Sequence, residues 1–399
     1  MIENKRAYQL IFSKTNSRLL AWLASCAAKT VGVCLSVCPR KREYISSDDK
    51  KAAEEKITDL WKRPPSSGEV RPLRAANGEA EVSVIVPAYN AEKYIAACVD
   101  SILGQKTACR VELIVVNDGS TDKTGEYLNE YRERENVVII DLENGKSAAS
   151  ARNAGLLRAV GKYVMFVDSD DVLLPGAIDA LVRTAEKTGA DVVQGGWCYM
   201  DESGNRGLTQ QYADACYTDE HETERFELPG MPWAKLYDRR LFEDIRFPEG
   251  YTSFEDAIIH FLVFRAAKKP VSVRDIVYCW RKNPDGITNC SQSSVRGLQS
   301  FWIARELVSL NERLGLSRDK AFRSCLVCQL SNFCYVNVAG LSHDVQTAVF
   351  TLCSDLFKNE LGDEDFSDLP YAVRLGARSL KEGRFDLWVR QGRLFELIR

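Results

Sequence analysis

The sequence predicts an α/β protein built on a mostly parallel β-sheet with helices on both faces, and two observations predict this class. Short, continuously apolar runs recur at Val82–Val86, Glu112–Val116, Val137–Ile140, Tyr163–Val167 and Asp191–Val193. Helical patterns separate them at about 92–104, 121–134, 147–160 and 175–189. Apolar strands that alternate with helices are typical of βαβ units with buried parallel strands. Right-handed crossovers then place helices on both faces of the sheet.

The segments on either side of this region differ from it in composition and in hydrophobic periodicity. The chain has 399 residues, so two or three units are expected at about 100–200 residues per domain. Residues 62–80 carry the Pro, Ser and Gly residues of a linker, and the charged stretch Asp48–Trp61 before them is helical in pattern. Apolar residues recur at helical spacing in 297–314, 319–340 and 344–359. We therefore expect an N-terminal helical extension with linker at 1–79, an α/β domain at 80–290 and a C-terminal helical region at 291–399.

Composition excludes several classes. Apolar residues make up 45% and charged residues 27% of the chain, which excludes wholesale disorder, a collagen-like chain and a polytopic membrane protein. The net charge of −3 argues against a nucleic-acid partner. The 13 cysteines are an odd, scattered set, which favours a reducing, cytoplasmic location.

The two ends of the chain are basic. Residues 1–45 carry eight Lys and Arg against two acidic residues, and the tail Arg374–Arg399 is basic with one apolar helical face. Peripheral contact with an anionic inner membrane surface is one prediction for these segments, and a helix packed on its own domain is the alternative for the tail. The run Leu19–Cys38 contains Lys29, so an amphipathic helix is favoured there over a membrane span or a cleaved signal.

Polar and acidic side chains follow three of the predicted strands. Pro87–Asn90 follows the first strand, Asn117–Asp122 the second and Asp168–Asp171 the fourth. Ligands of an open α/β sheet bind beyond the carboxyl ends of its strands. Carboxylates gathered there repel one another, and a divalent cation such as Mg²⁺ or Mn²⁺ removes that cost. The pattern therefore predicts a site for a metal ion and a nucleotide phosphate.

Simpler interpretations of these motifs remain open. Asp118 and Gly119 alone fit a turn with a helix cap, and Asp170 or Asp171 fits a cap as well. The stretch Asn144–Ser147 resembles the end of a phosphate-binding loop, but residue 140 is isoleucine where that loop needs glycine. We therefore expect Ser147 to cap a helix. No GxGxxG follows the first strand, which argues against a dinucleotide-binding fold.

The order and spacing of four motifs resemble those of the family-2 inverting glycosyltransferases of GT-A fold, of the bacterial cell-surface polysaccharide type. The motifs are Val82–Asn90, Asn117–Asp122, Ala151–Gly155 and Phe166–Asp171. The resemblance covers residues 82–200 closely and 230–290 more loosely, and it leaves out the first 80 residues and the last hundred. It implies a GT-A catalytic domain at 80–290.

The resemblance also implies roles for residues on the donor side. The nucleotide-sugar-binding residues would be Pro87, Tyr89, Asn90, Asp118, Arg152, Asn153, Asp168 and Ser169. Asp118 would bind the base edge, and Asp170 would hold a divalent metal, Mn²⁺ or Mg²⁺, on the diphosphate. The sequence departs from the family at Asn117, where many members have aspartate, so an anionic role at that position is in doubt.

The second half of the domain would supply the acceptor side. Trp233–Tyr237 resembles a tryptophan–lysine–leucine–tyrosine stretch of the family, and Ser253–Asp256 resembles its acidic pair before a helix. By this resemblance Asp256 is the catalytic base and Glu255 the fallback, although the pair would also cap a helix that starts at Ala257. Residues expected on the acceptor or diphosphate side are Trp233, Lys235, Tyr278 and Arg281. We expect His260, one turn after Asp256, to be structural.

The resemblance implies a metal-dependent, inverting glycosyltransferase. It would transfer a sugar from a nucleotide-sugar, expected to be a UDP-sugar, to a hydroxyl of a glycan or lipid-linked acceptor. The expected role is bacterial surface polysaccharide biosynthesis. A nucleotidyltransferase would need a glycine-rich basic loop where Pro87–Asn90 stands. An inactive carbohydrate-binding or scaffold protein would not need Asp118, Asp168, Asp170 and Asp256 together. A processive synthase would be expected to carry several membrane spans and a QxxRW-type stretch, which the sequence lacks.

Overall fold

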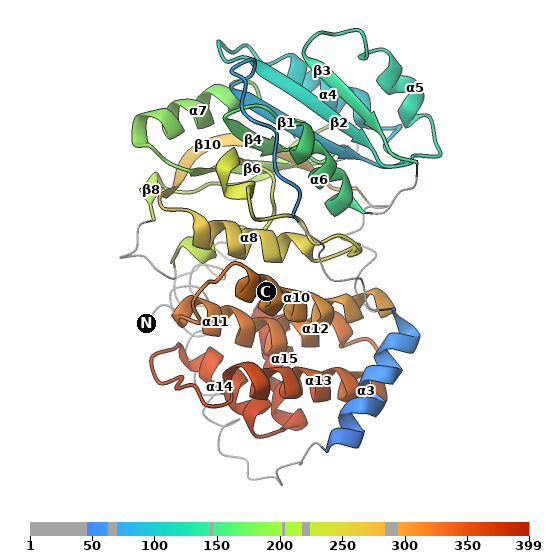
Figure 1. Ribbon diagram of the computed structural model, residues 1–399, viewed down its shortest axis with the longest axis vertical. Helices are drawn as coiled ribbons and strands as arrows, with labels where there is room; N and C mark the ends of the chain where they lie inside the picture. Colours follow the sequence, from blue (N-terminus) through green and yellow to red (C-terminus); the bar gives the residue numbers. More distant parts are fainter. Residues whose placement is uncertain are drawn as a thin grey trace. The chain divides into compact units, whose positions relative to one another are not determined.

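The computed structural model of the chain describes residues 46–62, 70–143, 147–201, 204–217, 224–283 and 294–398. The chain divides into two compact units, one of residues 64–289 and one of residues 1–63 with 290–399 (Figure 1). The predictions for Leu19–Cys38 lie outside the described residues. Among the helices that are described, none is long and apolar enough to cross a membrane.

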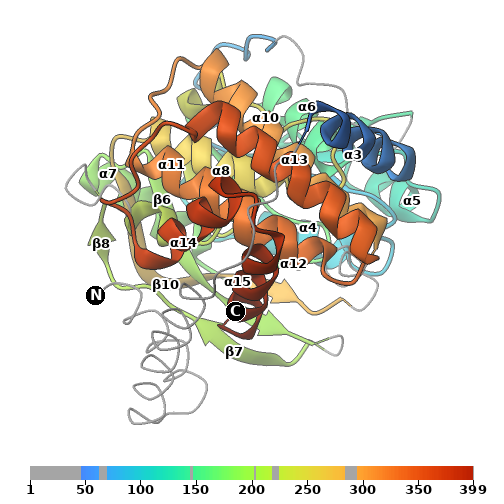
Figure 2. The same ribbon diagram turned by 90° about the horizontal axis from the view of Figure 1, so that it is seen from below.

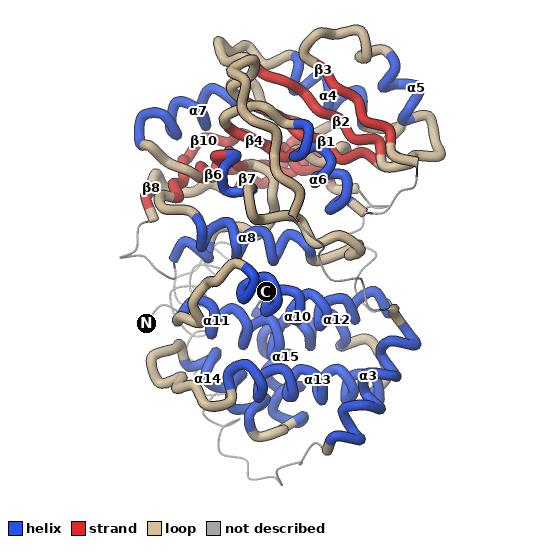
Figure 3. Tube along the Cα trace, viewed as in Figure 1, coloured by secondary structure: helices blue, strands red, loops and turns tan. Residues whose placement is uncertain are grey.

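The α/β unit is organised around one ten-stranded sheet (Figure 3). Its first half consists of parallel strands in the order β3 (Val137–Asp141), β2 (Val111–Asn117), β1 (Val82–Ala88) and β4 (Tyr163–Phe166). The order continues through β9 (Lys235–Asp238), β6 (Val192–Met200), β10 (Pro270–Arg281) and β5 (Val172–Leu173), and the short strands β7 (Arg206–Gln210) and β8 (Ala215–Cys216) pair with β6 and β10. β9 is antiparallel to both its neighbours, whereas β6 and β10 are parallel to each other.

The two faces of the sheet are covered by different helices. Val82, Val84 and Val86 of β1 belong to the core that also buries residues of α4 (Ile95–Leu103), α5 (Thr124–Asn129) and α7 (Ala177–Thr188). Ile85, of opposite parity, points to the other face and meets Gly155 of α6 (Ala148–Arg158). Since strand side chains alternate between faces, α6 lies on the face opposite to α4 and α7. The predicted α/β class with helices on both faces is confirmed.

Helix α6 is held at its start and along its inner face. The Ser147 side chain caps it by accepting a hydrogen bond from the Ser150 backbone N–H, as the sequence predicts. A Cβ atom at Gly155 would stand 2.4 Å from Ile85 Cγ2, so glycine is what allows α6 to approach β1 this closely. An aromatic cluster of Phe166, Phe242 and Phe247 packs with edge contacts on the same side, with ring centres 5.2–5.6 Å from Phe166.

The second unit is helical (Figure 2). It contains α3 (Ser47–Leu60), α10 (Gln299–Arg313), α11 (Lys320–Cys328), α12 (Cys334–Val338), α13 (His343–Leu361), α14 (Tyr371–Lys381) and α15 (Phe385–Ile398). Helix α3 packs on α13, and the two are joined by an ion pair of Lys50 with Asp355 at 2.8 Å. The predicted helix 319–340 is interrupted by a π-helical turn at Gln329–Phe333.

The basic tail forms two helices because Gly383, at φ 64°, turns the chain between α14 and α15. Four apolar residues of the tail, Leu375, Leu380, Leu387 and Trp388, are buried within this unit, whereas Phe395 is 38% exposed. The apolar face of the tail is therefore used in packing, which agrees with the helix-on-domain alternative.

Candidate active site

Two loops at the carboxyl end of the sheet are tied together by Asn90. Its backbone N–H donates to Ser120 Oγ at 3.0 Å, and its side-chain Oδ1 accepts from the Thr121 N–H at 2.8 Å. Asn90 has a φ of 47°, in the left-handed region that asparagine tolerates. Pro87 is buried inside β1, whereas the Tyr89 side chain is 57% exposed. Of the three residues predicted to line a nucleotide pocket, Tyr89 and Asn90 are exposed, and Tyr89 has the larger side chain.

At the end of β2, Asn117 pairs with an acidic neighbour on β3. The Asn117 side-chain amide donates to Asp141 Oδ1 at the end of β3, at 2.9 Å. An aspartate would have no donor for this contact and would face Asp141 as a like charge. Asp118 is buried, and its Oδ2 accepts from the Ser147 N–H at the start of α6, at 3.1 Å. Asp118 therefore links β2 to the cap of α6.

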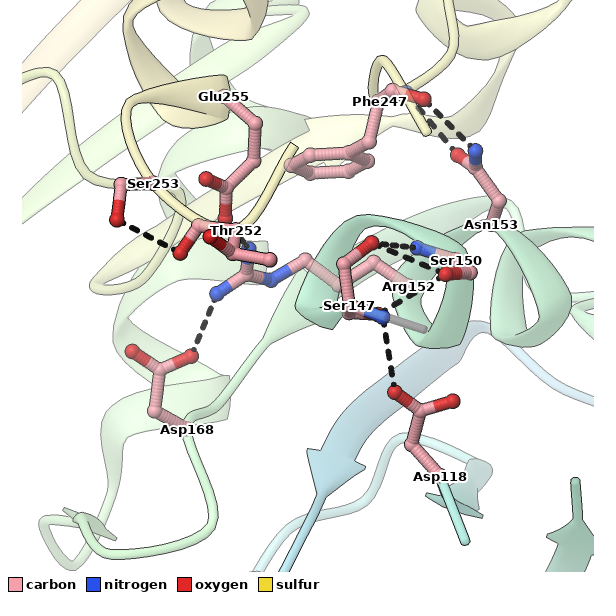
Figure 4. Close-up of polar contacts among 10 residues, drawn as sticks. All are labelled: Asp118, Ser147, Ser150, Arg152, Asn153, Asp168, Phe247, Thr252, Ser253 and Glu255. Atoms are coloured by element: carbon pink, nitrogen blue, oxygen red, sulfur yellow. Dashed lines mark hydrogen bonds and ion pairs between the residues drawn. The ribbon is translucent and has the colours of Figure 1, made fainter. Parts of the chain in front are cut away.

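Arg152 joins two acidic motifs that are far apart in the sequence, one containing Asp168 and the other Glu255. Its Nη2 donates to Asp168 Oδ1 at 2.9 Å and its Nη1 donates to Glu255 Oε1 at 3.0 Å (Figure 4). The side chain is 6% exposed, and the guanidinium lies 5.3 Å from the centre of the Phe247 ring. Burial opposes the charge of this guanidinium, but the nearby carboxylates of Asp168 and Glu255 outweigh burial and raise the pKa of Arg152.

The neighbouring residue Asn153 supports this arrangement. Its Nδ2 donates to the Phe247 carbonyl at 2.8 Å and to Glu249 Oε1 at 3.1 Å, while its Oδ1 accepts from the Phe247 N–H at 3.0 Å. Asn153 thus fixes the backbone whose aromatic ring packs on Arg152. Its predicted contact with nucleotide or sugar stays a prediction.

Asp171, which was not among the predicted site residues, anchors the loop after β4. It is 1% exposed, and it accepts hydrogen bonds from Tyr278 Oη at 2.6 Å and from the Arg281 N–H at 2.7 Å. Burial, together with Asp170 and Asp168, raises the pKa of Asp171 well above its usual range. The Tyr278 oxygen also accepts from the Asp168 N–H at 3.1 Å. The sequence signal for this anchor was the third acidic residue of the Asp168–Asp171 motif.

Asp170 is the residue of this loop that is best suited to a metal ion. Its Oδ2 accepts from Asn283 Nδ2 at 3.1 Å, and Arg281 Nε donates to its backbone carbonyl at 2.8 Å. Burial and the charge of Asp168 raise the pKa of Asp170, which is the penalty that a nearby cation would remove. Ser169, between the two acids, is partly buried. In the described ranges no three Asp, Glu, His or Cys side chains gather as metal ligands. A cation held by Asp170 would therefore complete its shell with diphosphate oxygens and water, as Mg²⁺ commonly does.

The acidic pair lies in the first turn of α8 (Glu255–Ala266). This helix begins two residues before the predicted start at Ala257, and its N-cap is Phe254, at φ 73°, with no side-chain capping bond. The pair therefore does not act as the N-cap. Burial and the adjacent Asp256 raise the pKa of Glu255 to about 7 against the opposing effect of Arg152, and burial also raises the pKa of Asp256.

The residues predicted for the acceptor side are mostly internal. Lys235 is fully buried, and its Nζ donates to the carbonyls of Pro229, at 2.8 Å, and Met231. Burial lowers the pKa of Lys235 to about 7. Trp233 is 6% exposed and stacks on Tyr278, with ring centres 4.6 Å apart. In this structure these side chains brace the segment before β9 and the loop after β4, whereas the sequence analysis expected them to face a ligand.

Two other predicted residues are placed by aromatic neighbours. The Arg281 guanidinium lies 4.7 Å from the centre of the Tyr94 ring, beside the Asp170 backbone. His260 lies against Phe264, with ring centres 4.5 Å apart, and burial lowers the pKa of His260 to about 3. A neutral, buried imidazole agrees with the structural role expected for His260.

Comparisons with known proteins identify the family. The sequence model of the family described as "Glycosyl transferase family 2" matches residues 83–247. The glycosyltransferase GlyG of Streptococcus pneumoniae is 33% identical over 219 residues, which are 52% of this chain and 72% of GlyG. The chain belongs to glycosyltransferase family 2. This glycosyltransferase is also 35% identical over 221 residues to EpsJ of Bacillus subtilis, described as an uncharacterized glycosyltransferase, with 52% of this chain and 62% of EpsJ covered.

Other relatives are longer than the shared region, and solved structures share the fold. GlyA of Streptococcus pneumoniae is 32% identical over 214 residues, which are 50% of this chain but 30% of GlyA. The chain thus spans less than two thirds of both GlyA and EpsJ.

The crystal structure of Staphylococcus aureus TarS 1–349 in complex with UDP-GlcNAc has a TM-score of 0.60 and 23% identity, over 79% of this chain and 92% of TarS 1–349. The GT-A fold predicted from the sequence is confirmed.

Proposed function

We propose that this glycosyltransferase transfers a sugar from a nucleotide-sugar to a hydroxyl of a glycan or lipid-linked acceptor, with inversion at the anomeric carbon. One observation carries the proposal. Arg152 is hydrogen-bonded both to Asp168, in the loop after β4, and to Glu255, at the start of α8 (Figure 4). This shared contact supports the proposal that the acids assigned to the donor and those assigned to the base act in one site.

The proposed reaction is a single displacement. The Asp256 carboxylate accepts the proton of the acceptor hydroxyl while the hydroxyl oxygen forms a bond to the anomeric carbon. The bond between that carbon and the diphosphate oxygen breaks, and the nucleoside diphosphate leaves from the opposite face with the electron pair. Burial raises the pKa of Asp256, which makes its carboxylate a stronger base than an exposed one.

A divalent cation, Mn²⁺ or Mg²⁺, fits the donor half of this site. Asp170 would hold it, with its carboxylate oriented by Asn283 and its backbone by Arg281. When bound, such a cation neutralises charge on the leaving diphosphate. Asp171 and Tyr278 keep the loop in place from the side of β10.

A UDP-sugar is the first donor to test, because the TarS structures that share this fold include complexes with UDP-GlcNAc and with UDP. Relatives also point to cell-surface polymers. TarS is described as a poly(ribitol-phosphate) beta-N-acetylglucosaminyltransferase, and GgaB of Bacillus subtilis, 28% identical over 240 residues, as a minor teichoic acid biosynthesis protein. We propose surface polysaccharide assembly as the role of this chain.

The direct test is a screen of nucleotide-sugars with Mn²⁺ or with a chelator, read as released nucleoside diphosphate. We expect release from at least one nucleotide-sugar with Mn²⁺ and a strong loss with the chelator. Asp170→Asn should lose the stimulation by metal, and Asp179→Asn, an acid on α7 outside the site, should keep it. Pyrophosphate release from a nucleoside triphosphate and a sugar phosphate would instead identify a nucleotidyltransferase. Equal turnover with and without chelator would refute the metal assignment.

We further propose a cytoplasmic location with contact at the inner membrane surface. Arg374 on α14, with Arg390 and Arg393 on α15, supports it because these side chains are exposed. Leu375, Leu380, Leu387 and Trp388 of the tail are buried, so the contact would be mainly electrostatic and weakened by salt. The test is flotation with anionic vesicles. Replacing these three arginines by glutamine should reduce binding, and unchanged flotation of that variant would exclude the tail as the contact.

A further inference from the structure

We propose that Arg152 is a positioning residue that binds one carboxylate of each acidic motif and leaves another for the reaction. It binds Asp168 and Glu255, and so leaves Asp170 for the diphosphate-bound metal and Asp256 for the proton. This inference rests on the proposed function. It differs from the expectation that Arg152 holds the nucleotide or sugar, because it gives Arg152 contacts with protein carboxylates only.

The first argument is the confinement of the Arg152 side chain. It is 6% exposed, and its two terminal nitrogens each donate to a different carboxylate, at 2.9 and 3.0 Å. The Phe247 ring lies 5.3 Å from the guanidinium carbon, and the backbone of Phe247 is itself bound by Asn153. A guanidinium held in this way is part of the framework of the site and has little freedom to reach a mobile ligand.

The second argument is charge. Glu255 is 7% exposed and adjacent in sequence to Asp256, and the two carboxylates repel each other. Two neighbouring buried carboxylates do not both ionise easily unless a cation compensates one of them. The charges of Arg152 and Lys235 both act on Asp256, but Arg152 donates its hydrogen bond to Glu255. This hydrogen bond favours the charged form of Glu255, although burial and Asp256 still raise its pKa to about 7, and Asp256 is left to act as the base.

The third argument is the link between the two motifs. Asp168 belongs to the donor loop, and its backbone N–H is fixed by the Tyr278 hydroxyl. Its carboxylate is bound to the same guanidinium that holds Glu255 on α8. A planar guanidinium that donates in two directions can fix the separation of two carboxylates, which the single ammonium of a lysine does less well. Arg152 therefore sets the distance between the donor loop and the base.

The test compares Arg152→Gln with Arg152→Lys, and with Arg158→Gln as a matched control on the same helix. Turnover and donor KM are measured with the nucleotide-sugar that the wild-type enzyme uses, and folding is checked by circular dichroism. We expect Arg152→Gln to lower kcat by about 10²-fold or more with a change in donor KM of less than about threefold. Arg152→Lys should retain part of kcat, and Arg158→Gln should match the wild type.

The double variant Arg152→Gln with Glu255→Gln decides the mechanism. The loss of kcat in Arg152→Gln is expected to come from an uncompensated Glu255 carboxylate. In that case, removing the Glu255 charge should raise kcat at least about fivefold over Arg152→Gln alone. A further loss in the double variant, or a raised donor KM with unchanged kcat in Arg152→Gln, would overturn the proposal. A wild-type enzyme that releases no nucleoside diphosphate from any nucleotide-sugar would refute the proposed function instead. If Arg152→Gln does not fold, the same comparison is made with Arg152→Lys.

Discussion

Replacing Gly155 by alanine tests whether the contact between α6 and β1 positions the site. Gly155 lies on the inner face of α6, three residues after Arg152, and the two positions are neighbours on the helix surface. An alanine Cβ would stand 2.4 Å from Ile85 Cγ2, 3.3 Å from Cγ1 and 3.4 Å from Cβ. Carbon atoms normally keep about 3.5–4.0 Å apart. The helix must therefore move away from the strand by about 1 Å.

The expected magnitudes follow from this overlap. Overpacking of a filled core costs roughly 1–3 kcal/mol, and alanine recovers about 1 kcal/mol of helix propensity over glycine. Gly155→Ala should therefore lower the free energy of unfolding by at most roughly 2 kcal/mol. The effect on catalysis should be larger, because a misplacement of about 1 Å in catalytic geometry can cost about 10²-fold in rate. The measurements are urea unfolding and nucleoside diphosphate release.

Two further variants separate crowding from other causes. At Gly125 in α5 an added Cβ would meet only Asn117 Nδ2, at 3.6 Å, so Gly125→Ala should be neutral or stabilising. Ile85→Ala removes Cγ1 and Cγ2, the two atoms nearest to the new Cβ, so the double variant with Gly155→Ala should be less destabilised than the sum of the single variants. The reasoning is refuted if Gly155→Ala is as stable and as active as the wild type, or if the double variant is strictly additive.

Three other predictions concern the carboxylates and their supports. Because the pKa of Glu255 is raised to about 7 and that of Asp256 is also raised, the pair retains a proton to higher pH than ordinary carboxyls, and transfer should fall as pH drops below about 7. A rate that stays flat from pH 5 to pH 8 would contradict this. Lys235→Met leaves two backbone carbonyls without their hydrogen-bond donor. It should therefore lower the free energy of unfolding in urea by about 1–3 kcal/mol and leave donor KM unchanged. A raised KM at unchanged stability would instead place Lys235 against a ligand. Tyr278→Phe removes the hydroxyl that binds Asp171 and should weaken both stability, by about 1–3 kcal/mol, and stimulation by Mn²⁺. Unchanged melting and unchanged metal response would exclude that role.

The main strands and helices could be predicted from the sequence because their signals are local. All seven residues of β1 are buried, which is what its mostly apolar run predicts, and the buried Ser83 donates a hydrogen bond to Glu112. β7 carries no such signal, because all five of its residues, Arg206–Gln210, are exposed and it forms only by pairing with β6. The packing of α3 on α13 is also absent from any local pattern, because the two helices are almost 300 residues apart in the sequence.

The sequence predicted which residue types form the candidate site, but it did not predict which way their side chains point. The motifs identify Asp168, Asp170 and the pair at Glu255–Asp256, and the structure brings Asp168 and Glu255 onto one guanidinium. A motif does not record whether a polar side chain faces a ligand or the protein interior. Lys235 was expected to face a substrate, yet it is fully buried and binds backbone carbonyls. Only three-dimensional packing shows that distinction, because burial of a lysine requires partners from elsewhere in the chain.

The most direct test of the account is turnover of Asp256→Asn measured beside Glu255→Gln, with donor binding followed by calorimetry. The account assigns proton transfer to Asp256 and a charge-paired, positioning contact to Glu255. Asp256→Asn should lower transfer by about 10²–10⁴-fold while donor affinity stays within about twofold of the wild type, and Glu255→Gln should lose clearly less. Near-normal turnover of Asp256→Asn, or a larger loss in Glu255→Gln, would contradict the account.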